Sequence, residues 1–372
     1  MKFTAKKNDV FNAVKKVGSV TEKSAIPVLS NILFATDKER KSVTVTASNL
    51  ELRLECTFEA EITDSGKTTI PGRKLISVLS AMQGADVEFD TDELHHTSIK
   101  SGRAKVKLLG LPADASPEQE EFTASCMLSM GMEQLTKLIK DGAYFVSTNM
   151  SRKALCGIYA EFEGNECHIV STNGKALAHA EITLAKNVLA EKKSFCIIPV
   201  AALNTLVSNA KADSVNIGFS DKKIMAQAGD FIVHSKLIEG TYPNYRNFLK
   251  NSYQNSAVLP VTETIAKLSL LNAVVSIDNP SVDVTISGST IKLTAESSAS
   301  GSVDDEMELF EGTDKEYTIT LNPSLLMQAF DSHKLEEKCT LNFDSETSPV
   351  EFKFENSIAV IMPIRRKTNN QQ

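Results

Sequence analysis

A short apolar strand that runs into a proline and then an amphipathic helix occurs three times along this chain of 372 residues. The prolines are Pro71, Pro199 and Pro323, so the copies are spaced 128 and 124 residues apart. An apolar residue follows each proline at the fourth position, as Leu75, Leu203 and Met327. Proline suits the first turn of a helix because its missing N–H would have no partner there. Solenoid repeats are much shorter, roughly 20–50 residues. We therefore predict three copies of one whole domain.

Other patterns recur in phase with the proline motif. Apolar residues at helical spacing predict a helix near the start of each third, at residues 8–17, 131–144 and 261–275. Alternating apolar and polar residues predict strands, for instance at 42–47, 158–162, 214–219, 282–286 and 338–343. This order of elements predicts an α+β fold in which each domain lays two helices on antiparallel sheet. The predicted domains are 1–122, 123–252 and 253–372.

Composition and cysteine spacing favour an intracellular protein. The formal net charge is −7 at pH 7, and no apolar run is long enough to span a bilayer or to form the core of a signal peptide. The six cysteines have no C-x-x-C spacing and are interpreted as free thiols: Cys56, Cys126, Cys156, Cys167, Cys196 and Cys339. These features predict a cytoplasmic location.

The sequence lacks the common catalytic motifs. It contains no G-x-x-x-x-G-K-[ST], G-x-S-x-G or H-E-x-x-H pattern, and Thr172-Asn173-Gly174-Lys175-Ala176 has too few glycines for a phosphate loop. The pair His95-His96, beside Asp92 and Glu93, suggests a metal site. Adjacent residues on a strand or turn point in different directions, which favours a polar hairpin tip instead. We predict no catalytic residue, no cofactor and no metal.

Seven local sequences distributed over essentially the whole chain carry a resemblance. They are Met1-Lys2-Phe3-Thr4, residues 26–33, Pro71-Gly72-Arg73-Lys74, Ser101-Gly102-Arg103, residues 172–178, residues 240–246 and residues 360–365. In this order and spacing they resemble the bacterial DNA polymerase III β subunit family, the processivity sliding clamps. The resemblance implies the DNA clamp fold and a head-to-tail homodimer of six similar domains. Such a dimer closes a ring around double-stranded DNA, with helices inside and a continuous antiparallel sheet outside.

Basic residues on the helices that would line the ring are the candidates for contact with DNA. A ring that slides needs phosphate contacts and few groups that read bases. We assign this role to Lys15, Lys16, Lys23, Arg73, Lys137, Lys140 and Asn149. By the resemblance, Lys23 replaces an arginine and Asn149 replaces a glutamine; lysine keeps the charge but loses the planar guanidinium fork. The alternative interpretation is that these lysines lie on ordinary solvated helix faces.

The resemblance also implies a pocket between the second and third domains that binds short linear motifs. Its partners in the family are the replicative polymerase, the clamp loader and repair proteins, including repair polymerases. The matching residues are Leu155, Thr172, Gly174, Lys175, Ala176, Leu177, Pro243, Arg246, Asn247, Val360, Ile361, Met362, Pro363 and Ile364. Lys175-Ala176 replaces the usual His-Arg, which deletes a large side chain, and a polar tail continues after Arg365. The alternative for each apolar residue is core packing.

Closure of the ring requires an interface between the first domain of one subunit and the third domain of the other. Matching positions on the first domain are Arg73, Lys74, Arg103, Lys105 and Val106, and on the third domain Val274, Val275, Asp304, Asp305 and Glu306. A head-to-tail contact of this kind closes a ring when the rotation per subunit is right. Opposite charges around an apolar centre would set its register.

Two other classes of function remain open from the sequence. An enzyme built from three repeated domains would need an acid–base or metal constellation, which the predicted loops do not show. A scaffold of the same fold that binds partners without encircling DNA would keep the pocket at 360–364. The function of such a scaffold would change little when Lys23, Arg73 and Asn149 are neutralised.

Overall fold

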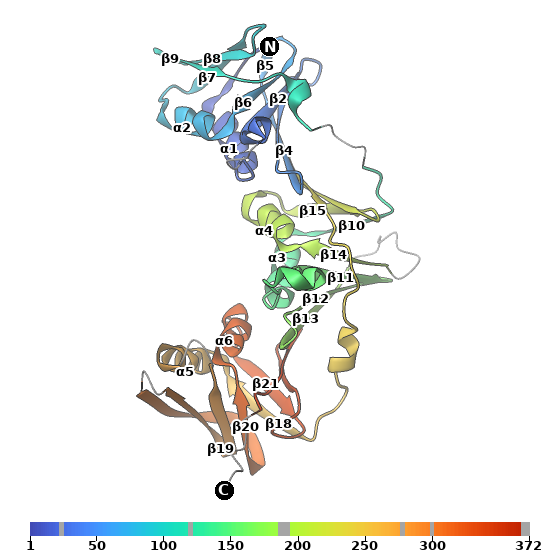
Figure 1. Cartoon of the computed structure of the whole chain (residues 1–372), viewed down its shortest axis with the longest axis vertical. Coiled ribbons are helices and arrows are strands. Elements are labelled where there is room, and N and C mark those ends of the chain that lie inside the picture. The colour runs from blue at the N-terminus through green and yellow to red at the C-terminus, as the bar shows by residue number, and fades with distance from the viewer. Residues whose placement is uncertain (22–25, 118–121, 185–193, 276–279, 298–300, 366–372) are drawn as a thin grey trace. The chain divides into compact units, whose positions relative to one another are not determined.

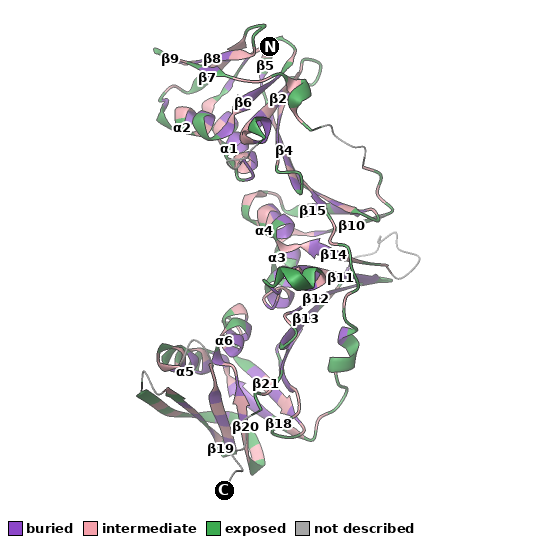
Figure 2. Ribbon diagram, viewed as in Figure 1, coloured by how far each residue is buried: buried purple, intermediate pink, exposed green. Residues whose placement is uncertain are grey.

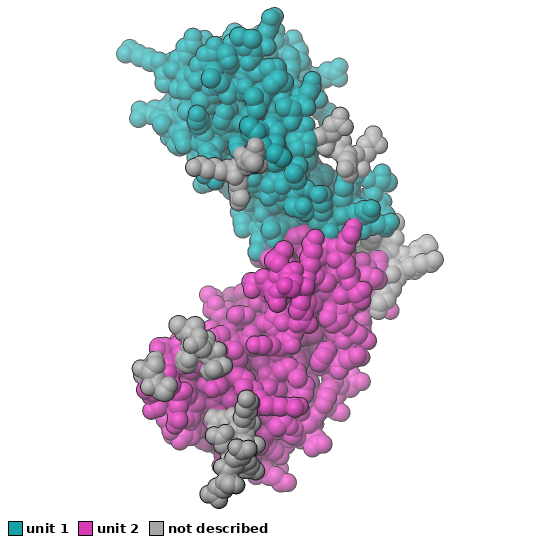
Figure 3. Space-filling model, in the orientation of Figure 1, with its two compact units in different colours: residues 1–133, 187–189, 201–237 teal, residues 134–186, 190–200, 238–372 magenta. Residues whose placement is uncertain are grey.

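The computed structural model describes residues 1–21, 26–117, 122–184, 194–275, 280–297 and 301–365 (Figure 1). Lys23 and the tail after Arg365 lie outside the described residues. The chain forms two compact units (Figure 3). The described residues of unit 1 lie in 1–133 and 201–237, and those of unit 2 lie in 134–184, 194–200 and 238–365.

Unit 1 contains two antiparallel sheets. The smaller has the order β5 (Glu61–Asp64), β1 (Lys2–Lys6), β7 (Asp86–Thr91), β8 (His96–Ser101) and β9 (Ala104–Leu109). The larger has the order β10 (Cys126–Gly131), β15 (Ser214–Phe219), β16 (Lys223–Ala228), β17 (Phe231–Lys236), β4 (Leu52–Glu59), β3 (Ser42–Ser48), β2 (Asn31–Asp37) and β6 (Lys67–Pro71). The pairing of β17 with β4, in which Phe231 faces Cys56, joins strands of the first and second predicted domains.

Unit 2 is built on one ten-stranded sheet. Its order is β14 (Ser194–Pro199), β11 (Gly157–Glu163), β12 (Glu166–Thr172), β13 (Ala176–Thr183), β23 (Ser357–Ile361), β22 (Val350–Lys353), β21 (Lys338–Phe343), β18 (Asn255–Pro260), β20 (Gly301–Leu321) and β19 (Val282–Ser297). The pairing of β13 with β23, in which Ala176 faces Ile361, joins the second predicted domain to the third. Each unit therefore holds a sheet that is continuous across a predicted domain boundary.

Helices cover these sheets with their apolar sides. They are α1 (Lys7–Gly18), α2 (Gly72–Ala81), α3 (Met132–Gly142), α4 (Val200–Asn209), α5 (Val261–Val274) and α6 (Pro323–Ser332). Short 3₁₀ turns lie at η1 (Pro27–Ser30), η2 (Ala113–Ala115), η3 (Met150–Cys156) and η4 (Tyr245–Phe248). In α1 the buried residues are Val10, Ala13, Val14 and Val17, the spacing of one helix face, and Figure 2 shows buried residues along helices and strands alike.

Aromatic residues occupy the centres of the two cores. In unit 1, Phe3 and Phe89 are completely buried and stack with ring centroids 4.7 Å apart. In unit 2, Phe330 of α6 meets Phe352 of β22 edge-to-face at 5.6 Å. Burying such large rings against helix and sheet contributes much of the hydrophobic stabilisation of each unit.

The predicted helices and strands are confirmed, with ends that differ by at most two residues, except that the strand predicted at 282–286 continues to Ser297 as β19. The prediction that every motif proline lies in the first turn of its helix is right for Pro323 and wrong for Pro71 and Pro199, which end strands β6 and β14. The fixed φ of proline also suits extended backbone, and at a strand end the missing N–H costs little. Pro260 ends β18 before α5 in the same way, a further copy that the sequence analysis missed.

No helix among the described residues combines the length and apolarity needed to cross a membrane. The five cysteines whose side chains are described are free thiols, as predicted; they are Cys56, Cys156, Cys167, Cys196 and Cys339.

These thiols are expected to react at very different rates. Burial raises the pKa of Cys56 and of Cys167 to about 12, and it raises the pKa of Cys339 well above its usual value. A thiol with a raised pKa holds little thiolate at pH 8, and the thiolate is the nucleophile. Alkylation of the native protein at pH 8, followed by peptide mass spectrometry, should modify the half-buried Cys156 and Cys196 first. Rapid alkylation of Cys56 would contradict this, and denatured protein should label all six cysteines of the chain.

Candidate functional site

A tight turn between β12 and β13 forms one side of an apolar cavity in unit 2. Thr172 Oγ1 donates to the carbonyl of Ala176 at 2.6 Å, and Asn173 Oδ1 accepts from the backbone N–H groups of Lys175 and Ala176 at 2.9 Å each. Gly174 has φ +86°, a conformation that favours glycine. A side chain there would also collide with Arg152, since a Cβ would lie 2.5 Å from Nη1. The sequence of this turn therefore fixes the backbone that lines the cavity.

The cavity has a volume of about 170 Å³. Four segments supply its wall: Arg152 of η3, the β12–β13 turn, the stretch before and within η4, and the end of β23. The sequence-predicted residues that line it are Thr172, Gly174, Lys175, Ala176, Leu177, Pro243, Val360 and Met362. Ala176 is buried, so the small side chain at this position leaves room that a larger one would fill.

Six residues assigned to the pocket do not line this cavity. Ile361 is completely buried in the core of unit 2, and Leu155 is buried within η3. Asn247 is exposed and accepts from Asn244 Nδ2 at 3.3 Å. Pro363 and Ile364 continue past the wall, where the Ile364 N–H donates to the carbonyl of Thr320 at 2.8 Å. The sixth residue, Arg246, is held by an ion pair.

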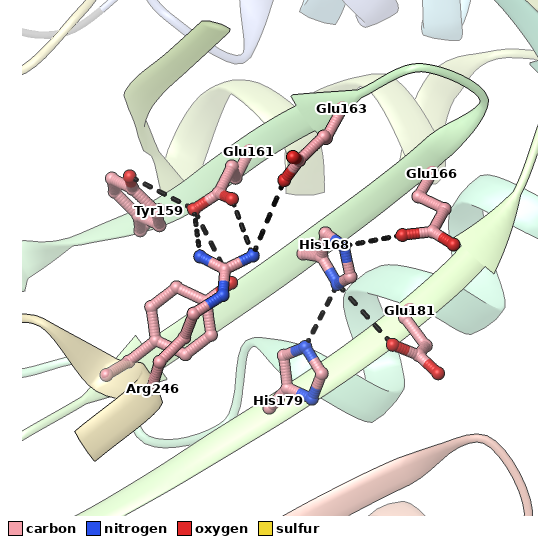
Figure 4. A network of polar contacts seen from close by, with 9 residues as sticks. Tyr159, Glu161, Glu163, Glu166, His168, His179, Glu181 and Arg246 are labelled. Atoms are coloured by element: carbon pink, nitrogen blue, oxygen red, sulfur yellow. Dashed lines mark hydrogen bonds and ion pairs between the residues drawn. The ribbon is translucent and has the colours of Figure 1, made fainter. Parts of the chain in front are cut away.

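The guanidinium of Arg246 makes two contacts with the carboxylate of Glu161 on β11 (Figure 4). Arg246 Nη1 donates to Oε2 at 2.8 Å, and Nη2 lies 2.7 Å from Oε1. The Glu161 side chain is only 2% exposed, whereas that of Arg246 is 42% exposed. The hydrogen bond to Glu161 raises the pKa of Arg246 further above its usual range. This paired fork anchors η4, and with it Tyr245, against the sheet.

Four residues of the cavity wall were missed by the sequence analysis: Arg152, Tyr242, Tyr245 and Phe248. Tyr245 is 3% exposed and packs with Val170, Leu177 and Val360 in a small apolar cluster. The Tyr242 hydroxyl donates to the carbonyl of Val170 at 3.4 Å. Tyr242 and Tyr245 lie within residues 240–246, one of the local sequences that carry the family resemblance, and this is the signal that could have found them.

Of the predicted DNA-contacting residues, Lys23 lies outside the described residues, Lys16 is half-buried and the others are exposed. Lys16 Nζ lies 3.3 Å from Asp230 Oδ1 and over the ring of Phe231. Its charge is therefore partly neutralised within unit 1. Lys137 forms a solvent-exposed ion pair with Glu355 at 3.3 Å. Asn149 caps η3, since its Oδ1 accepts from the Ser151 N–H at 3.0 Å. Lys15, Arg73 and Lys140 place their side chains on exposed helix positions.

The residues assigned to ring closure lie at sheet edges and at a helix end. Arg103 and Lys105 are exposed and Val106 is half-buried, all on or beside the edge strand β9; Lys74 is exposed on α2. Val274 and Val275 are half-buried at the end of α5. Two of the three residues in the acidic run 304–306 already form ion pairs within unit 2. Asp304 pairs with Lys292 at 2.8 Å and Asp305 with Lys267 at 2.7 Å, and the hydrogen bond from Lys267 lowers the pKa of Asp305.

The histidine pair at 95–96 lies at the β7–β8 turn, as expected for a hairpin tip. His96 Nδ1 faces Asp92 Oδ2 at 3.6 Å, whereas His95 Nδ1 lies 3.5 Å from Thr68 Oγ1. The two rings therefore have different partners.

A buried serine–histidine contact in unit 2 resembles part of a hydrolase site but lacks access. Ser357 Oγ lies 2.6 Å from His333 Nε2, and Asp141 Oδ1 lies 3.7 Å from the same nitrogen. His333 Nδ1 bonds to the carbonyl of Ala329 at 2.8 Å. Ser357 is 5% exposed and His333 is 2% exposed, so no substrate reaches the hydroxyl. A catalytic base must lie within reach of its substrate, which makes this a structural contact.

Structural comparison places the fold among solved sliding clamps. The crystal structure of the DNA polymerase sliding clamp from Bacillus subtilis matches with a TM-score of 0.92 at 20% sequence identity, covering 99% of this chain and 100% of that chain. The DNA polymerase III subunit beta from Pseudomonas aeruginosa matches with a TM-score of 0.91 at 22% identity, covering 98% and 100%. The chain thus has the three-domain α+β clamp fold.

Sequence comparison gives the same result. The Beta sliding clamp of Chlamydia muridarum is 25% identical over 371 residues, covering 98% of this chain and 99% of that protein. The Beta sliding clamp of Vibrio cholerae is 24% identical, covering 98% and 100%. Residues 1–120 match the family model of the DNA polymerase III beta subunit, N-terminal domain, and residues 129–244 match that of its central domain. Because these matches span more than half of the sequence, the chain belongs to the DNA polymerase III beta subunit family, the beta sliding clamps.

Proposed function

We propose that this protein is a DNA sliding clamp that encircles duplex DNA as a homodimeric ring and tethers the replicative polymerase. The observation that carries the proposal is the agreement of fold over nearly the entire chain with solved clamps, together with full-length similarity to proteins named Beta sliding clamp. Its role is that of an accessory subunit, without catalysis of its own, and its location is the cytoplasm.

Exposed cations on helices support contact with the DNA backbone. Lys15, Arg73 and Lys140 offer positive charge on a chain whose net charge is −7. Local positive charge on an acidic body attracts phosphate at one surface and repels it elsewhere. Phosphate contacts carry no sequence information, so they allow a ring to slide.

The apolar cavity in unit 2 supports a second part of the proposal, the docking of short apolar motifs. Leu177, Tyr245 and Val360 form its apolar side, and Met362 lies at its wall with 40% of its surface exposed. A flexible methionine adapts to different side chains, which suits several partners. We propose that the replicative polymerase, the clamp loader and repair proteins dock here.

Retention on DNA of different topology tests encirclement. The protein is loaded with a clamp loader onto nicked circular plasmid and onto the same plasmid after linearisation, and bound protein is measured after gel filtration in high salt. High salt removes electrostatic binding but not a topological link. We expect retention on circles and loss from linear DNA. Equal loss from both, with a loader proven on its own clamp, would reject encirclement and favour a partner-binding scaffold of the same fold.

A further inference from the structure

Two buried histidines and a glutamate converge on one face of the unit 2 sheet (Figure 4). His168 lies on β12, and His179 and Glu181 lie on the neighbouring strand β13. His168 is directly opposite Glu181 in the antiparallel register, and His179 is its diagonal neighbour on the same face. His168 is 8% exposed and His179 is 7% exposed, while 63% of the Glu181 side chain is exposed.

The donor atoms have the spacing of metal ligands. His168 Nδ1 lies 3.2 Å from His179 Nε2 and 3.5 Å from Glu181 Oε2, and all three donor atoms lie within 4.8 Å of one another. Two ligands of a tetrahedral Zn²⁺ ion, each bound at about 2.1 Å, are about 3.4 Å apart. A proton between the two ring nitrogens joins them in the metal-free chain, and a metal ion would replace that proton.

Neighbouring groups already orient the two rings. The second nitrogen of His168, Nε2, faces the carboxylate of Glu166 at 3.4 Å. A carboxylate on the far nitrogen is the usual outer partner of a metal-bound histidine, since it fixes the tautomer and raises the basicity of the ligand. The ring of His179 stacks on that of Tyr245 with centroids 5.6 Å apart. The site is therefore preorganised on two paired strands, and the exposed Glu181 gives an ion a route in from solvent.

We propose that His168, His179 and Glu181 form a binding site for a divalent transition metal of the zinc class, with the fourth position open to water. Two imidazoles and one carboxylate suit Zn²⁺ and Co²⁺ better than Mg²⁺ or Ca²⁺, which prefer oxygen ligands alone. Tyr245 stacks on His179 and also lines the apolar cavity, so the ring of Tyr245 would separate the ligand His179 from that cavity.

Metal titration of the full-length, tag-free dimer tests the site. Isothermal calorimetry with ZnCl₂ should show one site per chain, and CoCl₂ should give the visible bands of tetrahedral Co²⁺ without thiolate-to-metal absorption. We expect His179→Gln to weaken Zn²⁺ binding by more than about 100-fold and Glu166→Gln by about 10-fold, because outer partners typically contribute 10–100-fold.

Glu181→Gln is the variant that keeps the test valid if a buried histidine variant fails to fold. Its side chain is largely exposed, so the fold should persist while Zn²⁺ affinity falls at least about 10-fold. The matched controls are His96→Gln, a histidine paired with a carboxylate elsewhere, and Glu163→Gln on the neighbouring strand β11. Both controls should bind Zn²⁺ as the parent chain does. Substoichiometric binding, thiolate absorption with Co²⁺, or an unchanged affinity in Glu181→Gln would each overturn the proposal.

Discussion

Replacing Val274 and Val275 together with glutamate is expected to convert the protein from dimer to monomer. Both residues are half-buried at the end of α5, where the proposed partner surface would cover them. Closing the ring would then bury two carboxylates, and an unpaired charge removed from water costs several kcal/mol. We expect the dimer Kd to rise more than about 100-fold, a change that sedimentation velocity at micromolar concentration detects.

The control for this double variant must carry the same charge on the same helix. Thr262→Glu with Ala266→Glu places two carboxylates at exposed positions of α5, and it should remain dimeric. Val275 also packs against the core of unit 2, so a circular dichroism melt must show that the Val274/Val275 variant is folded. Val106→Glu on the edge strand β9 probes the opposite surface independently. A folded dimer in both variants would reject this interface.

Replacing Arg246 with alanine is expected to destabilise unit 2 by about 3 kcal/mol. The loss leaves the Glu161 carboxylate, 2% exposed, without the cation that contacts both of its oxygens. Breaking a buried ion pair from one side costs more than the pair itself contributes, because the remaining charge stays buried. Arg246 also lies over the ring of Tyr245 at 4.8 Å, so the cavity wall should loosen with it. Urea unfolding followed by tyrosine fluorescence measures the effect.

Glu163→Ala provides the comparison for this prediction. Glu163 lies 3.9 Å from the same guanidinium, but 54% of its side chain is exposed, and exposed ion pairs contribute about 0–1 kcal/mol. Combining Arg246→Ala with Glu161→Gln should recover part of the lost stability, since no buried charge then remains. If Arg246→Ala is no more destabilising than Glu163→Ala, the ion pair does not hold η4 in place.

The candidate site was predictable through the family resemblance, which supplied the pocket residues. The turn at 172–176 is fixed by an asparagine and a glycine whose roles follow from their chemistry, and eight sequence-predicted residues line the cavity. Ile361 was assigned to the pocket, together with Val360, because the family resemblance implies it. Successive residues on a strand face opposite sides of the sheet, so Val360 reaches the cavity while Ile361 enters the core.

Charge interactions were harder to predict because they depend on side chains brought together by folding. The run Asp304-Asp305-Glu306 looks like a free acidic surface in the sequence, yet Lys267 and Lys292 already neutralise much of it. Likewise, His168 and His179 are eleven positions apart in the sequence, and only the register of β12 against β13 places their ring nitrogens 3.2 Å from each other.

The sequence by itself determined the threefold repeat, the helices and the strands with clear alternation of apolar and polar residues, because these follow from side-chain burial that repeats over a few residues. Only the tertiary structure decided which strands meet. Phe231 pairs with Cys56 and Ala176 with Ile361, so strands of successive predicted domains share one sheet. Periodicity specifies the buried face of a strand but not its neighbour, since the backbone hydrogen bonds of a ladder are the same for every partner. The cavity depends on those pairings, because its wall combines four segments that the fold alone brings together.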